Sequence, residues 1–446
     1  MSNSPQRPSR RWVGLATVSA AALSLSLASG FSSAGRPVPA ASRAKKSITL
    51  AMWLGPQGTM MVQHDIQAFE KLHPNIQVTL EPLSWQAYNT KITTELISGS
   101  GPDVVEIPYE SWIYDGYVKS LTPFLRADHT FSMSNYFPVA ANYSRYNGHR
   151  FGVGNEYGLP WRCFTTAILY NQTMFSKHHV PYPKPGWTYN TMLADARKLT
   201  HMGPQNNPNK STMGLWWFLS KSQTGYDPVI WSFGGHEFNP KRTALTMNGP
   251  RSEAAIHWLM NAMYKWKVMA NPIEAGSGFN FSAGNIAMAE MHNAYIPSYR
   301  AIIGNTFKWG VAPMPKGPAG IAGSRVFVHT IGIARNAQHP RASWQLLTYL
   351  VSKASENALV KEGSLPALKS SAKLYAKQKG GPPGIGVFYS DLAHARMSAM
   401  FNHDHGVESI VNAELSLLWL NKVSIPKAIH QIEVQGNSHL KSTGGF

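Results

Sequence analysis

The chain has 446 residues, of which 43% are hydrophobic, 11% aromatic and 14% charged. That length and apolar content are enough for one large or two medium globular domains with real cores. The only cysteine, Cys163, excludes an intramolecular disulfide and a metal cluster held by several thiolates. The formal charge of +18 comes from a shortage of acid, because 41 Lys and Arg face only 23 Asp and Glu. The basic residues form no stripe, which argues against a nucleic-acid partner.

The first 46 residues are expected to be a signal peptide and linker. Arg7, Arg10 and Arg11 precede a short apolar run, and the first acidic residue is Asp65. A basic head, an apolar core and small residues after it are typical of a secretory signal. A single transmembrane anchor needs about 20 apolar residues, and this run is short and rich in serine. The small residues "VPA" at 38–40 predict a mature chain that starts near Ala41.

The signal sequence does not show by which route the protein is exported or how it is attached to the cell. "LASGF" at 27–31 is similar to a bacterial lipoprotein box, but Phe31 stands where the lipidated cysteine would be. No acyl anchor is therefore expected. "SRRWV" at 9–13 partly matches a twin-arginine signal, so both export routes remain. Removing residues 1–40 deletes four arginines and leaves +14 on the mature chain. With so few carboxylates to protonate, we expect the fold to persist at low pH, as in an acidic habitat.

The segment after residue 46 alternates strand and helix patterns. "SITLAMWL" (47–54), "NIQVTLEPL" (75–83) and "PDVVEIP" (102–108) are rich in β-formers, whereas 59–74 and 85–101 have apolar residues at helical spacing. Strand–helix–strand–helix–strand predicts parallel pairing in an α/β fold. Ligands of such sheets bind beyond the carboxyl ends of the strands, here near 53–55 and 109–112.

Several stretches together carry a specific resemblance. They are "AMWLG" (51–55), the run from "AFEKLHPNIQ" to "PDVVEI" (68–107), "YVKSLTPFL" (117–125), "YGLPW" (157–161), "ILYNQTMF" (168–175), "WSFGG" (231–235), "FSAGNIAMAE" (281–290), "WGVAPMPKGP" (309–318) and "SLPALKSSA" (364–372). In this order they resemble the extracellular solute-binding proteins of ABC importers, family 1, the group that contains maltose-binding protein. The resemblance covers nearly everything after residue 47.

The resemblance implies a periplasmic-binding-protein-like fold of two α/β lobes with a hinge and a ligand cleft between them. We expect lobe 1 at 47–150 plus 320–365 and lobe 2 at 151–319 plus 366–446. The chain would cross between the lobes at 145–154 and again at 312–320. The second crossing, "APMPKGPAG", is stiffened by prolines and too short for a flexible linker.

The motifs give little support to catalysis. No HExxH, GxSxG or P-loop pattern occurs, and the spaced glycines of "GVGNEYG" (152–158) precede no helix. The histidines of 403–405 are two apart, so they do not share a helix face and a solvated interpretation is favoured over a metal site. A glycosidase needs two carboxylates about 5 to 9.5 Å apart, and Glu110 and Glu156 are candidates. A binding protein also uses carboxylates to accept hydrogen bonds from hydroxyl groups.

Binding features are better supported. The chain has 14 Trp and 18 Tyr, and a flat indole covers the apolar face of a sugar ring while polar neighbours hold its hydroxyls. The resemblance points to ten ligand-binding positions: Trp53, Gly55, Asp103, Glu110, Trp161, Arg162, Trp231, Gly234 (with Gly235), Tyr295 and Phe401. Asp103 has an equal claim to brace the following strand. For Trp231 we expect alanine to weaken sugar binding and to change unfolding little.

Two positions depart from maltose-binding protein. Phe164 stands where that protein has a ligand-contacting glutamate, and Tyr295, not a tryptophan, stands near the position of a stacking tryptophan in that protein. Maltose itself is therefore not expected, whereas sugar as a class is. The resemblance implies a secreted, monomeric receptor that binds a carbohydrate and presents it to a membrane permease, without cofactor, metal or nucleic acid. Two alternatives remain: a receptor for glycerol 3-phosphate or a related phosphodiester, favoured by the charge and Arg162, and a secreted glycan hydrolase.

Overall fold

A computed structural model describes residues 45–204, 207–220, 225–398 and 404–444. The predicted signal and cleavage site therefore lie outside the described residues. The strands are β1 (Lys46–Trp53), β2 (Ile76–Leu83), β3 (Val104–Ile107), β4 (Arg145–Tyr146), β5 (Asn155–Glu156), β6 (Leu159–Asn171), β7 (Met213–Trp216), β8 (Ile286–His292), β9 (Trp309–Ala312) and β10 (Val326–Ile333).

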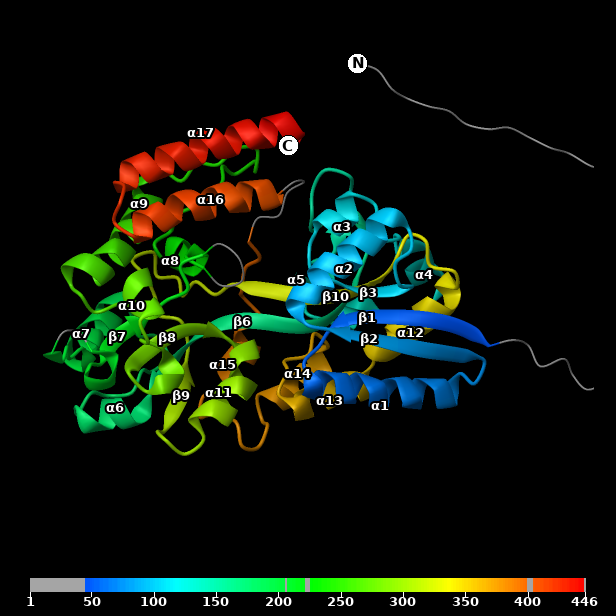
Figure 1. Cartoon of the computed structure of the whole chain (residues 1–446), viewed down its shortest axis with the longest axis horizontal. Coiled ribbons are helices and arrows are strands. Elements are labelled where there is room, and N and C mark those ends of the chain that lie inside the picture. Colours follow the sequence, from blue (N-terminus) through cyan, green and yellow to red (C-terminus); the bar gives the residue numbers. More distant parts are fainter. Residues whose placement is uncertain (1–44, 205–206, 221–224, 399–403, 445–446) are drawn as a thin grey trace, which may run out of the picture. The chain divides into compact units, whose positions relative to one another are not determined.

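Helices lie in the connections between these strands and also follow the last strand, β10 (Figure 1). They are α1 (Pro56–Leu72), α2 (Trp85–Ser98), α3 (Ser111–Tyr114), α4 (Thr122–Ala127), α5 (Pro138–Ala141), α6 (Gln172–Lys177), α7 (Tyr189–Leu199), α8 (Asp227–Ser232), α9 (Pro250–Met260), α10 (Pro272–Gly276), α11 (Ile296–Ile303), α12 (Pro340–Leu350), α13 (Lys353–Glu362), α14 (Lys369–Tyr375), α15 (Gly386–Asp391), α16 (Asp404–Trp419) and α17 (Ile425–Thr443).

Eight of these strands form one mixed sheet in the order β2-β1-β3-β10-β6-β8-β7, with β9 also beside β6. β1 pairs in parallel with both β2 and β3, so the predicted strand–helix–strand–helix–strand unit is confirmed. The strand β10 runs antiparallel to β3 and to β6. Sequence alternation thus identified the first three strands correctly, together with the two helices between them.

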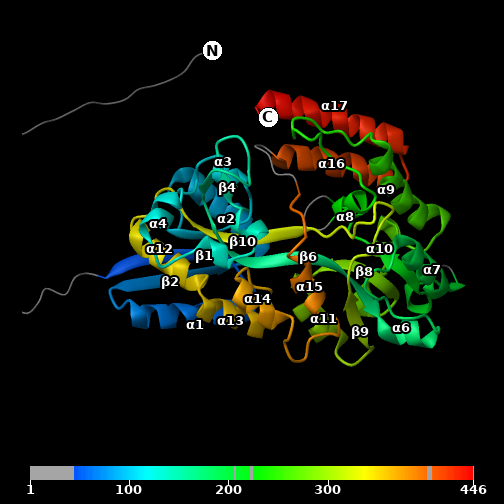
Figure 2. The same cartoon turned by 180° about the vertical axis from the view of Figure 1, so that it is seen from behind.

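The long strand β6 joins the two ends of the sheet (Figure 2). Its first half, up to Thr165, pairs with β10, whereas its second half, from Thr166 onward, pairs with β8 and β9. One continuous strand therefore carries the chain from the sheet's N-terminal half into the half built by residues 166–312.

The two faces of the sheet are covered differently. On one face a single apolar cluster extends along the whole sheet, from Val62 and Phe69 of α1 to Trp309 and Val311 of β9. On the other face the cover is divided into two separate clusters. One lies under α2 and contains Tyr88, and the other lies under α7, α9, α16 and α17.

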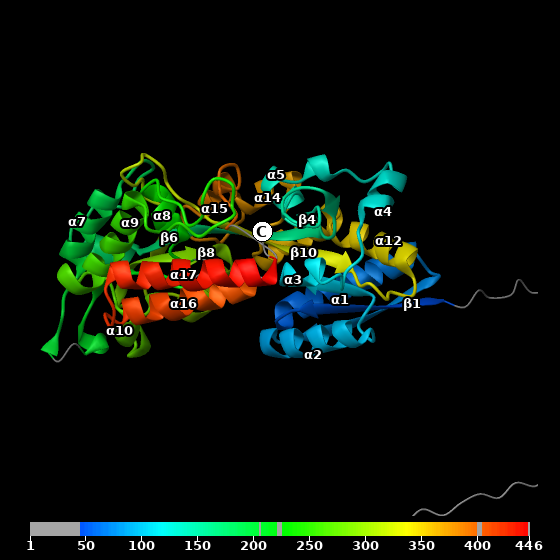
Figure 3. The same cartoon turned by 90° about the horizontal axis from the view of Figure 1, so that it is seen from above.

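The view in Figure 3 shows α16 and α17 side by side, next to the region of α2 and α3. The divided cover follows from strand alternation, because Ile48, Leu50 and Met52 of β1 enter the continuous cluster while Ala51 enters the cluster under α2. A cavity lies on the face of the sheet that is covered by two separate clusters.

The two segments predicted as crossings pack as follows. Residues 145–156 form a hairpin, β4–β5, whose Tyr146 and Phe151 stack 4.6 Å apart and belong to the cluster under α2. The backbone of Lys316, within the proline-rich segment, bonds to Trp187 and to Tyr189 of α7. The lobe boundaries themselves stay a prediction.

Candidate functional site

A cavity of about 470 Å³ opens on the face of the sheet that carries two separate apolar clusters, one under α2 and one under α7, α9, α16 and α17. Its walls come from chain segments far apart in the sequence: the ends of β1 and β3, the start of α2, strand β10, the segment before α16 and α16 itself. The lining includes Trp53, Trp85, Glu106, Tyr109, Glu110, Tyr143, Arg325, Phe327, His329, Met397, Ser398, Glu408 and Asn412. The prediction that the cleft lies near 53–55 and 109–112 matches the position of this cavity at Trp53, Tyr109 and Glu110.

The floor of the cavity is one face of β10 and its neighbours. Arg325, Phe327 and His329 alternate with Val326 and Val328, which are buried in the continuous cluster on the opposite face. In the pairing with β6, Phe327 lies opposite Phe164 and His329 opposite Arg162. The rings of Phe327 and Phe164 stack with centroids 4.6 Å apart. Cross-strand pairs of this kind stabilise the pairing of β10 with β6.

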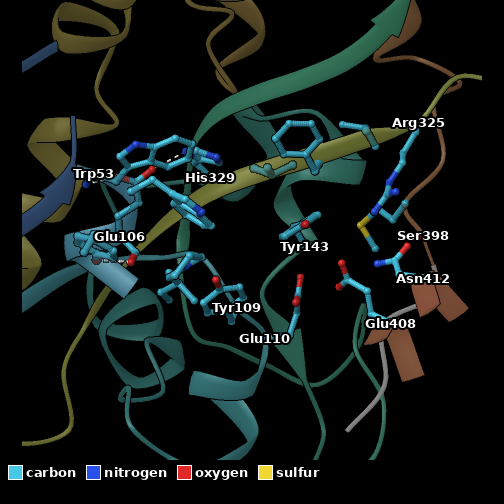
Figure 4. Close-up of a pocket in the computed structure, with 18 of the residues that line it drawn as sticks. Trp53, Glu106, Tyr109, Glu110, Tyr143, Arg325, His329, Ser398, Glu408 and Asn412 are labelled. Carbon is cyan, nitrogen blue, oxygen red and sulfur yellow. Dashed lines mark hydrogen bonds and ion pairs between the residues drawn. The ribbon is translucent and has the colours of Figure 1, made fainter. Parts of the chain in front are cut away.

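Three aromatic rings form one wall (Figure 4). Trp53 ends β1 and lies with its ring centroid 4.4 Å from that of Trp85, at the start of α2. Trp85 in turn lies 5.9 Å from Tyr109, and Trp53 lies 5.3 Å from His329. All four side chains are only partly buried. The wall therefore offers flat apolar faces to a ligand, with polar atoms beside them.

A buried charge cluster supports this wall from below. The carboxylate of Glu106 forms an ion pair, at 3.2 Å, with Nη2 of Arg162 and contacts Nδ1 of His329. Burial lowers the pKa of His329, so that contact is an ion pair only when the imidazole is protonated. The carboxylate also accepts a hydrogen bond from the backbone N–H of Trp53 at 3.1 Å. Burial alone would raise the pKa of Glu106, but the charges of His329 and Arg162 and these hydrogen bonds hold the pKa below its ordinary value. The cluster fixes the end of β1, where Trp53 stands.

The opposite wall is polar and comes largely from α16. Glu408 and Asn412 are four residues apart, so they face the cavity from one side of that helix. Across from them the carboxylate of Glu110 accepts a hydrogen bond from the hydroxyl of Tyr143. Burial, together with the charge of Glu110, raises the pKa of Tyr143, so its hydroxyl stays protonated.

Arg325 links the floor to α8. Its Nη1 lies 3.5 Å from the carboxylate of the fully buried Asp227, which also accepts a hydrogen bond from Ser398. The carboxylates, amide, hydroxyls and guanidinium around the cavity are the groups that hold sugar hydroxyls in a dry site.

The structure brings only some of the predicted positions together. Trp53 and Glu110 line the cavity. Arg162 lies beneath it, bound to Glu106, with its guanidinium carbon 4.1 Å from the ring centroid of Trp161. Trp161 is completely buried, so it supports Arg162 from within the core. Gly55 precedes α1 and is not among the lining residues.

Asp103 braces the backbone, which is one of the two roles expected for it. Its carboxylate accepts hydrogen bonds from the backbone N–H groups of Thr49 (3.0 Å) and Gln338 (2.8 Å), and it does not line the cavity. These bonds tie β1 to the segment that follows β10.

Trp231, Gly234 and Gly235 lie in or directly after α8, on the side of the sheet that is covered by α7, α9, α16 and α17. Trp231 is 8% exposed and belongs to the core cluster under α8 and α9, so the expectation that its loss changes unfolding little is wrong. A Cβ on Gly235 would meet Cα of Ser252 at 2.8 Å, and one on Gly234 would meet Ala319 at 3.1 Å. Both glycines therefore serve close packing. Ligand contact by Trp231 stays a prediction.

Two further positions lie elsewhere. Tyr295 packs with its ring 4.7 Å from His292 and 5.8 Å from Phe218, and it does not line the cavity. Phe401 and the histidines of 403–405 fall where the structure describes no side chains. Within the described ranges, no group of three or more His, Cys, Asp or Glu side chains is arranged to hold a metal ion.

The sequence analysis missed several lining residues, and two of them carry a signal. Glu106 is a single acid in the four-residue strand "VVEI", all of it buried, and His329 is a single titratable group in "VFVHTIGI". A charge inside an apolar strand requires a partner, and these two are partners of each other. Trp85, Tyr143, Glu408 and Asn412 carry no such signal, because only the fold brings their segments together.

Glu156, the second glycosidase candidate, is 5% exposed and does not line the cavity. Burial raises its pKa to about 8, although the N–H groups of Gly158 and Tyr157 and the charge of Arg145 oppose this. The unfolded chain releases this proton near pH 4.5, so Glu156 lowers stability as the pH rises from about 4.5 to 8. Burial acts in the same direction on Asp391 and raises its pKa to about 7.

We expect Glu156→Gln to raise the free energy of unfolding at pH 8 by on the order of 2 kcal/mol and to leave it nearly unchanged at pH 4. Urea titrations at both pH values measure this difference. The partly exposed Glu414, replaced by glutamine, is the control and is expected to change neither value. An equal effect of Glu156→Gln at both pH values would contradict the assignment.

Comparisons with known proteins agree with this architecture. The sequence model of the family described as bacterial extracellular solute-binding protein matches residues 61–357. A protein of Brucella abortus (strain 2308) that is named "putative binding protein" is 23% identical over 316 residues, which are 69% of this chain and 72% of that protein.

Solved structures share the fold. An ABC substrate-binding protein of Listeria monocytogenes, in complex with cycloalternan, is 21% identical with a TM-score of 0.78, over 89% of this chain and 99% of that one. The GacH receptor of Streptomyces glaucescens, solved unliganded and with acarbose, is 18% identical with a TM-score of 0.71, over 90% and 99%. The predicted two-lobe fold of periplasmic substrate-binding proteins is confirmed.

None of the helices in the described part of the chain combines the length and apolar character needed to cross a membrane. The match to the family model covers more than half of the chain, and the fold agrees with it along nearly its whole described length. The chain belongs to the family of bacterial extracellular solute-binding proteins, a family of binding proteins rather than enzymes.

Proposed function

We propose that this protein is the extracellular receptor of an ABC importer and that it binds a sugar or oligosaccharide in the cavity above β10. One observation carries the proposal: three neighbouring aromatic rings, Trp53, Trp85 and Tyr109, line the same cavity as the hydroxyl-binding groups Glu110, Glu408 and Asn412. A pyranose has the same division, with apolar ring faces and a polar edge. The similar structures with cycloalternan and acarbose support a carbohydrate as the class.

The proposed mechanism is closure of two lobes about β6 and β10. The lobes would be built on β2-β1-β3 and on β8-β7 and β9, and β6 changes partners between Thr165 and Thr166. Because the cavity draws residues from both sides of this point, a ligand that contacts both walls favours the closed arrangement. Delivery to permease subunits, action as a monomer and a secreted or periplasmic location are parts of the same proposal.

The charges in the cavity favour a neutral sugar over glycerol 3-phosphate there. Arg162, the residue that suggested a phosphate, is already paired with Glu106 beneath the cavity. Glu110 and Glu408 add carboxylates to the lining, and Arg325 is held by Asp227. A dianionic ligand in this cavity would meet like charges at short range.

The hydrolase alternative requires a different carboxylate pair from the one expected. Glu156 is remote from the lining, so Glu110 and Glu408 are the two acids that face one another across the cavity (Figure 4). We propose that they accept hydrogen bonds from sugar hydroxyls and break no bond, in line with a family of binding proteins.

A thermal-shift panel tests the proposal. It contains α-glucosides, both linear and cyclic, together with β-mannosides, acarbose and glycerol 3-phosphate. A ligand at 100 times its dissociation constant adds about 2.7 kcal/mol to the free energy of unfolding, so we expect at least one oligosaccharide to raise the melting temperature. Stabilisation by glycerol 3-phosphate alone would contradict the proposal. Sustained release of shorter sugars from the stabilising oligosaccharide would establish the hydrolase instead.

A further inference from the structure

A second hollow of about 450 Å³ lies next to the ligand cavity. Its lining includes Val139 of α5, Trp231 of α8, His236, Arg242, Arg396 and Met397. Met397 lines both this hollow and the first cavity. The two spaces are therefore neighbours that share one lining residue.

The shared wall is held by backbone hydrogen bonds. The N–H of Arg396 donates to the carbonyl of Ser324, and the N–H of Val326 donates to the carbonyl of Arg396, each at 2.9 Å. Arg325, between these two residues, lines the first cavity. Arg396 is thus tied in register to the strand that forms the floor of the first cavity, so its place beside the second hollow is set by the sheet.

Arg242 is held at the hollow by a strained turn. Its φ is +56°, a left-handed conformation that side chains other than glycine rarely adopt. Asn239 fixes the turn, because its carbonyl accepts from the N–H of Arg242 at 2.8 Å and its side chain accepts from the N–H of Thr243 at 2.7 Å. The side chain of Asn437, in α17, accepts a hydrogen bond from the N–H of Leu245 at 2.7 Å and so anchors the residues that follow the turn.

The hollow concentrates positive charge. Arg242 and Arg396 are both exposed in its lining, and Arg150 of the β4–β5 hairpin is near enough to act on Arg242. Burial, with the repulsion from Arg150, lowers the pKa of Arg242. In the described part of the chain, none of these three arginines forms an ion pair. The acid in the lining, Glu237, accepts a hydrogen bond from the buried hydroxyl of Tyr226 at 2.6 Å.

These observations contrast with the first cavity, whose arginine is paired and whose walls carry carboxylates. The second hollow is lined by the mostly buried indole of Trp231 and by Arg242 and Arg396, which form no ion pair with the described residues. Guanidinium groups bind carboxylate and sulfate oxygens in pairs, and an indole offers an apolar contact to a sugar. Taken together, the hollow fits a sugar unit that carries a negative charge.

We propose that the ligand is an anionic oligosaccharide, with a neutral unit against Trp53 and an acidic unit, a uronate or a sulfate ester, in the hollow of Trp231, Arg242 and Arg396. This rests on the proposed function, because it extends the same binding site. The division of charge between the two spaces sets the direction in which the oligosaccharide lies.

Isothermal titration of the mature protein tests this with oligosaccharides matched in length and backbone. One pair is trigalacturonic acid and its methyl ester, and the other is a sulfated trisaccharide and its desulfated form. At least one acidic member is expected to bind about tenfold or more tightly than its neutral partner, the effect of a charge-assisted hydrogen bond. Its affinity is also expected to fall when salt is raised, more steeply than that of the neutral partner. The two pairs distinguish a carboxylate from a sulfate.

The double variant Arg242→Gln/Arg396→Gln is expected to reduce the acidic-to-neutral affinity ratio to near one. The control, Arg126→Gln/Arg341→Gln, removes the same charge from exposed arginines of α4 and α12 and is expected to keep the ratio. Equal binding of each pair by the wild type, or an unchanged ratio in the Arg242→Gln/Arg396→Gln protein, overturns the proposed subsite while neutral sugars still bind. If no oligosaccharide binds, acidic or neutral, the proposed function fails as well.

Discussion

Replacing Trp53 with alanine is expected to weaken oligosaccharide binding about thirtyfold to thousandfold, because a central aromatic anchor commonly carries 2 to 4 kcal/mol of the binding free energy. Trp53 is the ring that joins the aromatic wall to the floor, since it lies against both Trp85 and His329. It is only partly buried, so its removal exposes a ligand face rather than a core. Calorimetric titration with the best oligosaccharide of the panel measures the loss.

Two further variants separate ligand contact from packing. Tyr182 is 42% exposed, contacts the rings of Tyr170 and Phe175, and is not among the lining residues of either space, so Tyr182→Ala is expected to bind as the wild type does. Trp231→Ala is expected to lower the free energy of unfolding by about 3 to 5 kcal/mol, because that side chain is in the core cluster. A Trp53→Ala protein that folds normally and binds with unaltered affinity would remove the aromatic wall from the site.

The second large effect concerns the charge cluster under the cavity. We expect Arg162→Ala to lower the free energy of unfolding at pH 7 by about 3 to 5 kcal/mol, since it leaves the carboxylate of Glu106 buried with one cationic partner fewer. Urea unfolding measures this loss. Arg335→Ala removes an exposed arginine that lies 5.8 Å from the ring of Tyr117, and it is expected to cost less than about 1 kcal/mol.

The effect of Arg162→Ala depends on pH in a defined direction. The pKa of Glu106 in the folded chain lies below its unfolded value of about 4.5, so the paired carboxylate stabilises the fold above that pH. This contribution is lost as the pH falls through the folded pKa. The difference between wild type and Arg162→Ala is therefore expected to shrink in acid. A difference that stays constant from pH 7 to pH 3 would assign the loss to packing against Trp161 instead.

Local patterns were enough for the first part of the fold. The alternation in 47–54, 75–83 and 102–108 and the helical spacing between them predicted a parallel unit, and the pairing of β1 with β2 and β3 confirmed it. Local rules suffice there because each strand pairs with the neighbour that its crossover helix brings to it. The same reasoning located the cavity at the ends of β1 and β3, and with them Trp53 and Glu110.

The individual ligand positions were less predictable, because a motif carries a residue's neighbours in sequence and not its neighbours in space. "YGLPWR" drew attention to Arg162, but its partner Glu106 is 56 residues away in sequence. "WSFGG" contains a tryptophan that is mostly core and two glycines that pack against Ser252 and Ala319. Asp103 braces two backbone segments, a role that its own segment suggests as readily as ligand binding.

The sequence by itself determined the family, the chain's shortage of acid and the strands that open the fold, since these depend on composition and on patterns within about 20 residues. The tertiary structure alone decided which side chains meet. β10 returns beside β6 and presents Phe327 and His329 on one face, and α16 comes from the end of the chain to close the cavity with Glu408 and Asn412. Contacts between segments hundreds of residues apart are set by the packing of the whole sheet and its helices, and no local pattern encodes that packing.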